Sequence, residues 1–123
     1  MNTKVIKISK HPKILIFSIQ RILPYTNTKN NCYVNFPDTL DITDFIDEDL
    51  GKKYNSFNKS GKCIFNLYSV VNHFGSLDFG HYNCFIKLKI HNLWYEFNDS
   101  STNLIGETLM DKSHAYCLYY MKE

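Results

Sequence analysis

The feature that most restricts the fold of this sequence is a regular alternation of side chains between His81 and Ile90. Every second position is apolar, which is the period of an extended strand, and these positions are Tyr82, Cys84, Ile86, Leu88 and Ile90. The intervening positions begin with His81 and are more polar. This pattern predicts a β-strand with one face toward a core. It places His81 on the face that can meet water or a substrate.

A second strand follows directly and is expected to pair with the first. The predicted turn is His91-Asn92, after which Leu93–Asn98 returns along the first strand. In an antiparallel hairpin the start of one strand lies near the end of the other, so Asn98 and Asp99 come within reach of His81. Because adjacent residues of a strand point to opposite faces, we expect only one of the two to face the imidazole.

A histidine beside a side-chain amide or carboxylate is suited to proton transfer. In cysteine proteases of the papain type, the imidazole takes the proton of a thiol, and an Asn or Asp holds the ring in the useful tautomer. His81, Asn98 and Asp99 are therefore the candidate catalytic residues. For Asn98 and Asp99 the alternative is an Asx turn that closes the hairpin, and both roles can hold together. For His73, which precedes the glycine turn, we expect a structural role.

The rest of the chain predicts more strand than helix. The apolar run Lys13–Ile22 suggests a strand that is covered on both faces. Further strands are expected over Cys32–Phe36, Lys62–His73 and Ala115–Met121. The remaining predictions are one helical turn at Asp41–Ile46, a short helix at Gly106–Lys112 and a flexible surface loop over residues 47–61.

Size, charge and cysteine spacing exclude several classes of function. Residues 1–123 form one domain or part of one, and the net charge of +2 argues against nucleic acid or an anionic membrane as a partner. No apolar run approaches the ~20 residues of a membrane span. The four cysteines contain no C-x-x-C pair, so no metal is expected, and no cofactor is expected either. Without a signal-peptide core, the cytoplasm or the nucleus is the expected location.

Several segments, taken in order, carry a resemblance. The segment His11–Ile22 is similar to the pattern Leu-Pro-Lys-x-Leu-x-x-x-Leu-Lys-Arg-Phe, and Val34 to Phe45 is similar to the pattern Val-x-Phe-Pro…Leu-Asp-Leu…Phe. Further matching stretches are Tyr68–Gly75, Gly80–Tyr82, Trp94–Ser100 and Ala115–Tyr120. In this order they resemble motifs of the ubiquitin-specific proteases, a papain-fold family of deubiquitinases. The resemblance covers nearly the whole chain from Lys13 onward.

The resemblance implies a fold and a place within it. The expected fold is α+β, the papain-like cysteine proteinase fold of these proteases, and this chain corresponds to its mostly antiparallel β palm with little helix. By the same resemblance His81 is the general base, Asn98 orients it and Asp99 is the adjacent carboxylate. The family's nucleophile lies in an upstream Asn-x-Gly-Asn-x-Cys-Tyr-x-Asn box, which has no match here. We therefore expect residues 1–123 to be the C-terminal half of a catalytic domain, which lacks the N-terminal thumb segment.

The implied activity is hydrolysis of the peptide or isopeptide bond after the C-terminal glycine of ubiquitin, with the nucleophilic cysteine outside this chain. Ubiquitin or a ubiquitinated protein is then the expected partner. The alternative is a truncated, inactive pseudo-deubiquitinase that acts as a ubiquitin- or protein-binding module. Presence or absence of a cysteine box in the adjoining coding sequence would separate the two.

Two further expectations concern single segments. Asn31–Asn35 superficially copies the cysteine box, but Cys32 lies by motif order in a strand with no helix after it, so we do not expect it to be a nucleophile. The run Ile14–Phe17 offers apolar side chains to both faces of its strand, and a one-layer sheet would leave one face in water. We therefore expect the isolated chain to associate or to need a second polypeptide.

Overall fold

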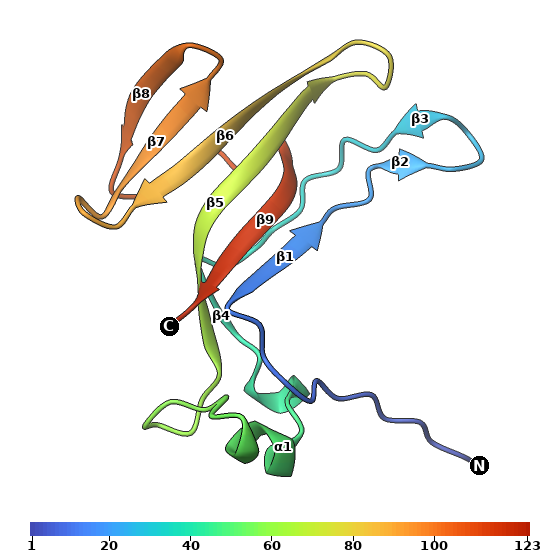
Figure 1. Ribbon diagram of the computed structural model, residues 1–123. Coiled ribbons are helices and arrows are strands. Elements are labelled where there is room, and N and C mark those ends of the chain that lie inside the picture. Colours follow the sequence, from blue (N-terminus) through green and yellow to red (C-terminus); the bar gives the residue numbers. More distant parts are fainter.

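Seven strands join in one antiparallel sheet, in a computed structural model that describes residues 1–123 (Figure 1). Their order is β1 (Ile14–Ser18), β9 (Ala115–Lys122), β5 (Ile64–Gly75), β6 (Gly80–Leu88), β7 (Leu93–Asn98) and β8 (Ser101–Gly106), with β4 (Thr39–Asp41) paired to one end of β5. A separate two-stranded ribbon consists of β2 (Ile22–Leu23) and β3 (Thr28–Lys29). The 3-10 turn η1 (Thr43–Phe45) and the helix α1 (Glu48–Lys53) lie below the sheet in Figure 1. Neither helical element is long and apolar enough to cross a membrane.

The long strand β5 holds the sheet together because it pairs with β9, β6 and β4. Its side chains change face at a bulge, where the β5–β9 register shifts between Leu67 and Ser69. A bulge inserts one extra residue and so reverses which positions face one side of the sheet. Phe65 and Leu67 before the bulge, and Val70 after it, are all buried in the core.

The sheet has two faces, which we call the core face and the outer face. The core face carries the buried side chains of the strands, among them Val70, Phe85, Trp94, Leu118 and Tyr120. Two irregular segments, 32–38 and 107–114, cover it with Phe36 and Leu109, and Tyr120 donates a hydrogen bond to the carbonyl of Pro37 (Oη to O, 2.6 Å). Both segments were predicted to be regular: Cys32–Phe36 as a strand and Gly106–Lys112 as a helix. Both predictions are wrong because these segments run across the core face as its cover.

The outer face holds the alternate side chains of the same strands. On the edge strand β1, Ile14 and Ile16 are 43% and 56% exposed. The expectation that Lys13–Ile22 is a strand covered on both faces is therefore wrong, since β1 ends at Ser18 and lies at the edge of a single layer. The expected exposure of one face of Ile14–Phe17 is confirmed by Ile14 and Ile16, but Phe17, which packs against Tyr120 on the core face, is also 42% exposed.

The stretch 47–61, expected to be a loop, contains the helix α1. Its start is fixed by the N-cap residue Asp47, whose Oδ1 accepts a hydrogen bond from the backbone N–H of Leu50 at 3.0 Å. Acidic residues occupy the first turn and lysines the last, which favours the helix dipole. The loop prediction is wrong for Glu48–Lys53, because the N-cap hydrogen bond and the favourable charges at both ends stabilise a helix in spite of the high polarity of this stretch.

Candidate active site

His81 and Asn98 meet at the open end of the β6–β7 hairpin. His81 Nε2 lies 2.6 Å from Asn98 Oδ1, and 3.9 Å from Asp99 Oδ2. An amide oxygen can only accept, so His81 Nε2–H is the donor and Nδ1 keeps its lone pair. The predicted contact between His81 and Asn98 or Asp99 is confirmed, and Asn98 is the direct partner.

A tight turn delivers His81 to this position. The backbone N–H of Ser76 donates to the carbonyl of Phe79 at 3.0 Å, and Gly75 has φ +94°, which a side chain rarely adopts. At Gly80 a Cβ would collide with the imidazole of His73. Glycine is therefore needed at both positions for the tight turn from β5 to β6, because neither position can hold a side chain. His81 follows as the second residue of β6.

The partner residues lie in the next turn. Asn98 and Ser101 pair as the last residues of β7 and the first of β8, so Asp99 and Ser100 form a two-residue hairpin loop. Asp99 has φ +50°, the left-handed region in which Asp is tolerated. Asp99 thus lies in the turn while Asn98 contacts His81, but neither side chain makes the backbone hydrogen bond of an Asx turn.

The site is open to solvent because the strands separate here. Backbone pairing between β6 and β7 ends at Cys84 and Phe97, before His81 and Asn98 are reached. The side chain of His81 is 48% exposed and that of Asp99 is 82% exposed. A group from another part of a protein can therefore approach the imidazole.

The turn between β6 and β7 is longer than predicted. The strands end at Leu88 and resume at Leu93, and Asn92 N–H donates to the carbonyl of Leu88 at 2.8 Å. The predicted turn at His91-Asn92 would pair Ile90 with Leu93, whereas Leu88 pairs with Leu93. A shift of two residues preserves the face of every side chain. The predicted contact between His81 and Asn98 is therefore still correct.

His73 is buried under the β2–β3 ribbon and supports the turn. Lys29 Nζ donates to the carbonyls of His73 and Gly75, at 3.0 Å each. The imidazole lies against the ring of Tyr82, with centroids 4.6 Å apart. Burial, and then the charge of Lys29, lower the pKa of His73. These contacts fit the structural role expected for His73.

None of the four cysteine thiols is hydrogen-bonded to His81. Burial desolvates the thiols of Cys63 and Cys84 and raises the pKa of both. A nucleophilic cysteine needs the opposite change, a lowered pKa. Cys32 is exposed and is held by its backbone: its N–H donates to Asn30 Oδ1 at 2.9 Å and its carbonyl accepts from Arg21 Nη1 at 2.8 Å. No group of three or more histidine, cysteine or acidic side chains is arranged to hold a metal ion.

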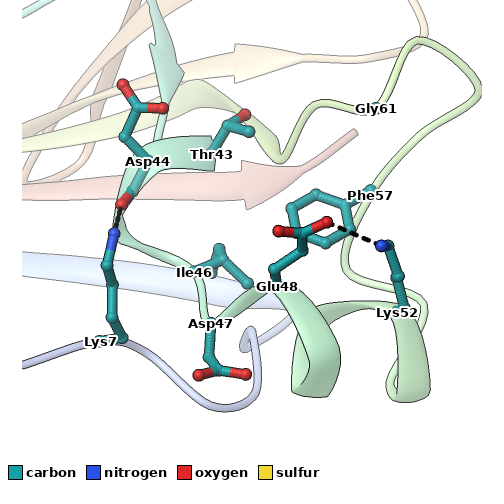
Figure 2. A pocket seen from close by; sticks show the side chains of 9 residues that line it. All are labelled: Lys7, Thr43, Asp44, Ile46, Asp47, Glu48, Lys52, Phe57 and Gly61. Carbon is teal, nitrogen blue, oxygen red and sulfur yellow. Dashed lines mark hydrogen bonds and ion pairs between the residues drawn. The ribbon is translucent and has the colours of Figure 1, made fainter.

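A hollow away from His81 lies beside η1 and α1 (Figure 2). Both of its lysines already have partners: Lys7 donates to the backbone carbonyl of Asp44, and Lys52 pairs with Glu48 at 2.8 Å between Nζ and Oε1. Only two of its lining residues, Ile46 and Phe57, are hydrophobic. The hollow has no feature that relates it to His81.

Sequence reasoning missed a set of polar residues beside the site. Asn72, Asn83, Glu96 and Asn103 are linked by hydrogen bonds across β5, β6, β7 and β8. A signal was present, because Asn83 follows His81 by two positions and Glu96 precedes Asn98 by two. In a strand, this spacing puts each on the same face as its neighbour in the site.

Comparison with known proteins gives consistent results. A family model described as ubiquitin carboxyl-terminal hydrolase matches residues 1–120. Ubiquitin carboxyl-terminal hydrolase 10 of Arabidopsis thaliana is 34% identical over 122 residues, which are 97% of this chain and 12% of that protein. Ubiquitin carboxyl-terminal hydrolase 2 of Gallus gallus is 32% identical over 121 residues, which are 96% of this chain and 31% of that protein.

Solved structures share the fold. The SAGA Ubp8/Sgf11/Sus1/Sgf73 DUB module bound to ubiquitin aldehyde matches with a TM-score of 0.72 and 25% identity, over 91% of this chain and 25% of the other. This likeness confirms the expected α+β fold, a mostly antiparallel sheet with little helix. The chain spans less than a third of the length of each of these relatives.

Proposed function

This chain belongs to the ubiquitin carboxyl-terminal hydrolase family, and from that membership we propose that it supplies the histidine side of a cysteine-type deubiquitinase active site. His81 is the general base and Asn98 orients its ring. The observation that carries this proposal is the 2.6 Å contact between His81 Nε2 and Asn98 Oδ1. This hydrogen bond selects the tautomer in which Nδ1 is free to accept a proton.

The chemistry follows from that tautomer. Nδ1 of His81 takes the proton of a thiol, and the thiolate attacks the carbonyl carbon of the bond after the C-terminal glycine of ubiquitin. The imidazolium returns the proton to the leaving amine, and water then hydrolyses the thioester. While the ring is charged, the Asn98 oxygen and the carboxylate of Asp99, 3.9 Å from Nε2, stabilise it. Ubiquitin is proposed as substrate because a solved relative is bound to ubiquitin aldehyde.

We place the nucleophile outside these 123 residues. The pKa of the thiol is raised in Cys63 and in Cys84, and the backbone of Cys32 is tied to Asn30 and Arg21. The purified chain should therefore release no fluorophore from a ubiquitin C-terminal amide. Turnover that disappears in Cys32→Ser but survives in Cys84→Ser would contradict this assignment.

The decisive test supplies a thiol by a chimera. The matching segment of Gallus gallus ubiquitin carboxyl-terminal hydrolase 2 is replaced by this chain, and cleavage of a fluorogenic ubiquitin amide is measured. Loss of the base in His81→Gln should lower kcat/KM by about 10²–10⁴-fold, the usual contribution of general acid–base catalysis. His91→Gln, in the turn of the same hairpin, is the matched control and should change little. Equal activity of the His81→Gln and unsubstituted chimeras would refute the proposal.

The second candidate is an inactive module that binds ubiquitin or another protein. The absence of a thiol bonded to His81 favours it. It predicts that the chain, and the chimera as well, bind ubiquitin without turnover. Saturable binding together with an inactive chimera would support this reading over the enzyme.

A further inference from the structure

Beside the contact of His81 with Asn98, polar side chains cross four strands of the sheet. Asn72 Nδ2 donates to Asn83 Oδ1 at 2.9 Å, and Asn83 Nδ2 donates to Glu96 Oε1 at 2.8 Å. Asn103 Nδ2 donates to the other carboxylate oxygen of Glu96 at 3.3 Å. Asn72 and Asn83 are only 1% and 7% exposed. We call these four residues the polar ladder.

The polar ladder lies one step along the strands from the site. Continuing the β6–β7 register past Cys84 and Phe97 would put Asn83 opposite Asn98. Asn83 does not bond to Asn98 but to Glu96, two residues earlier on β7. His81 makes the same diagonal step, because it bonds to Asn98 rather than to the residue opposite. The two hydrogen bonds are therefore successive diagonal links of one kind between β6 and β7.

The position of these links matters because the backbone ladder has already ended. The last backbone pair between β6 and β7 is Cys84 with Phe97. Asn83 and His81 both lie beyond this pair on β6, while their partners on β7 are Glu96, which still pairs with Phe85, and Asn98. These two side-chain hydrogen bonds therefore continue the contact between the strands past the last backbone pair.

The direction of the hydrogen bonds is set by the carboxylate. Ionised Glu96 can only accept, so the Nδ2 groups of Asn83 and Asn103 must both face it. Asn83 then presents Oδ1 to Asn72, which must donate. Because Asn72 and Asn83 are buried, reversal of either amide would leave a polar group unpaired. The ladder thus has a single low-energy orientation.

We propose that Glu96 and Asn83 are positioning residues, which fix the strand spacing that keeps Asn98 Oδ1 against His81 Nε2. This inference rests on the proposed function, since it assigns a purpose to the orientation of His81. Neither residue touches a reacting atom in this role. They act through the imidazole, so the readout must report on the imidazole itself.

The test exchanges donor and acceptor between the two residues. In Asn83→Asp, two carboxylates face each other and the link to Glu96 is lost. In the double variant Asn83→Asp with Glu96→Gln, Gln at 96 can donate to Asp at 83 and still accept from Asn103, so every partner is satisfied and the net charge is that of the original chain. The ¹⁵N and ¹H resonances of the His81 imidazole, and exchange of its Nε2 hydrogen with water, are measured on the full chain with ¹⁵N-labelled histidine.

Two further variants calibrate the readout. Asn98→Ala removes the acceptor of His81 and defines the resonances and the faster exchange of an unoriented ring. Asn103→Ala removes the other hydrogen bond of the same carboxylate and is the matched control. We expect Asn83→Asp to move His81 most of the way toward the Asn98→Ala values, the double variant to restore the original values, and Asn103→Ala to change little. If Asn83→Asp does not fold, Asn83→Ser removes the same link without adding charge.

Each outcome has one meaning. If the Asn83 variants lower the melting temperature but leave the His81 resonances unchanged, the ladder is merely structural and the inference fails. Failure of the double variant to restore His81 also overturns it. If Asn98→Ala itself leaves His81 unchanged, the pair of base and orienting residue fails, which refutes the proposed function rather than the ladder.

Discussion

The core face and the outer face of the sheet are covered by different parts of the chain. Irregular segments close over the core face, where Phe36 and Leu109 join the buried strand residues. The outer face is covered where the β2–β3 ribbon lies over His73 but open at β1, where Ile16 is 56% exposed. His81 and Asn98 stand at the end of the well-covered core face, on strands. A site that needs fixed geometry is best supported by rigid elements with packed neighbours.

The largest expected effect tests the packing of the core face. Trp94 is 2% exposed and lies on β7, two residues before Glu96. Trp94→Ala should reduce the free energy of unfolding by about 3–5 kcal/mol, because it removes a large buried side chain and leaves a cavity. Ile16→Ala on the outer face is the control. Urea denaturation that gave similar losses for both would remove the difference between the faces.

Tyr120 sharpens the comparison through pH. Its phenol is buried on the core face and donates to the carbonyl of Pro37, and burial raises its pKa to about 12. Tyrosine in the unfolded chain ionises near pH 10. The contribution of Tyr120 to stability is therefore fully present below pH 10 and is lost as the pH rises to about 12, a loss of about 2–3 kcal/mol. Unfolding between pH 9 and pH 12 should be less pH-dependent in Tyr120→Phe, and parallel curves for the two proteins would contradict this.

The outer face should promote association of the isolated chain. Exposed apolar side chains and the free edge of β1 are both sites for contact between copies. Ile16→Lys places a charge on this exposed surface. The variant also loses the apolar burial that Ile16 would gain between two associated copies, which is worth about 1–2 kcal/mol. Sedimentation should show a larger share of monomer for the variant. A soluble monomer without substitution, which melts cooperatively above roughly 50 °C, would show that the outer face needs no cover.

The smallest effect concerns the covered end of the outer face. His73 is kept neutral by burial, and then by Lys29, so its pKa is lowered. Its ordinary pKa is 6.5, and in the unfolded chain it takes up a proton below that value. Stability from His73 is present above pH 6.5 and is lost as the pH falls from there through the lowered pKa of the folded chain, by at most about 1.4 kcal/mol per pH unit, the limit for a single proton. His73→Gln should show a smaller drop in melting temperature between pH 7.5 and pH 5 than the unsubstituted chain, and His91→Gln should not.

Part of the site could be predicted because it depends on contacts near in sequence. The alternation from His81 and the return strand to Asn98 fix which ends meet, and an error of two residues in the turn left the faces unchanged. The polar ladder was not predicted because its members come from four strands. The partner of Glu96 depends on the β7–β8 and β6–β7 registers together, and sequence spacing alone specifies neither.

The sequence by itself determined the strands β6 and β7, their antiparallel pairing and the meeting of His81 with Asn98, since these follow from the period of two and a short turn. Only the tertiary structure decided which face is buried. The face of β6 that begins at His81 is the more polar in sequence, yet it carries Asn83 and Phe85 in the interior, while Tyr82 on the other face is 55% exposed. The physical reason is that an amide such as Asn83 can be buried once Asn72 and Glu96 complete its hydrogen bonds. That condition depends on neighbouring strands and on the segments that cover them.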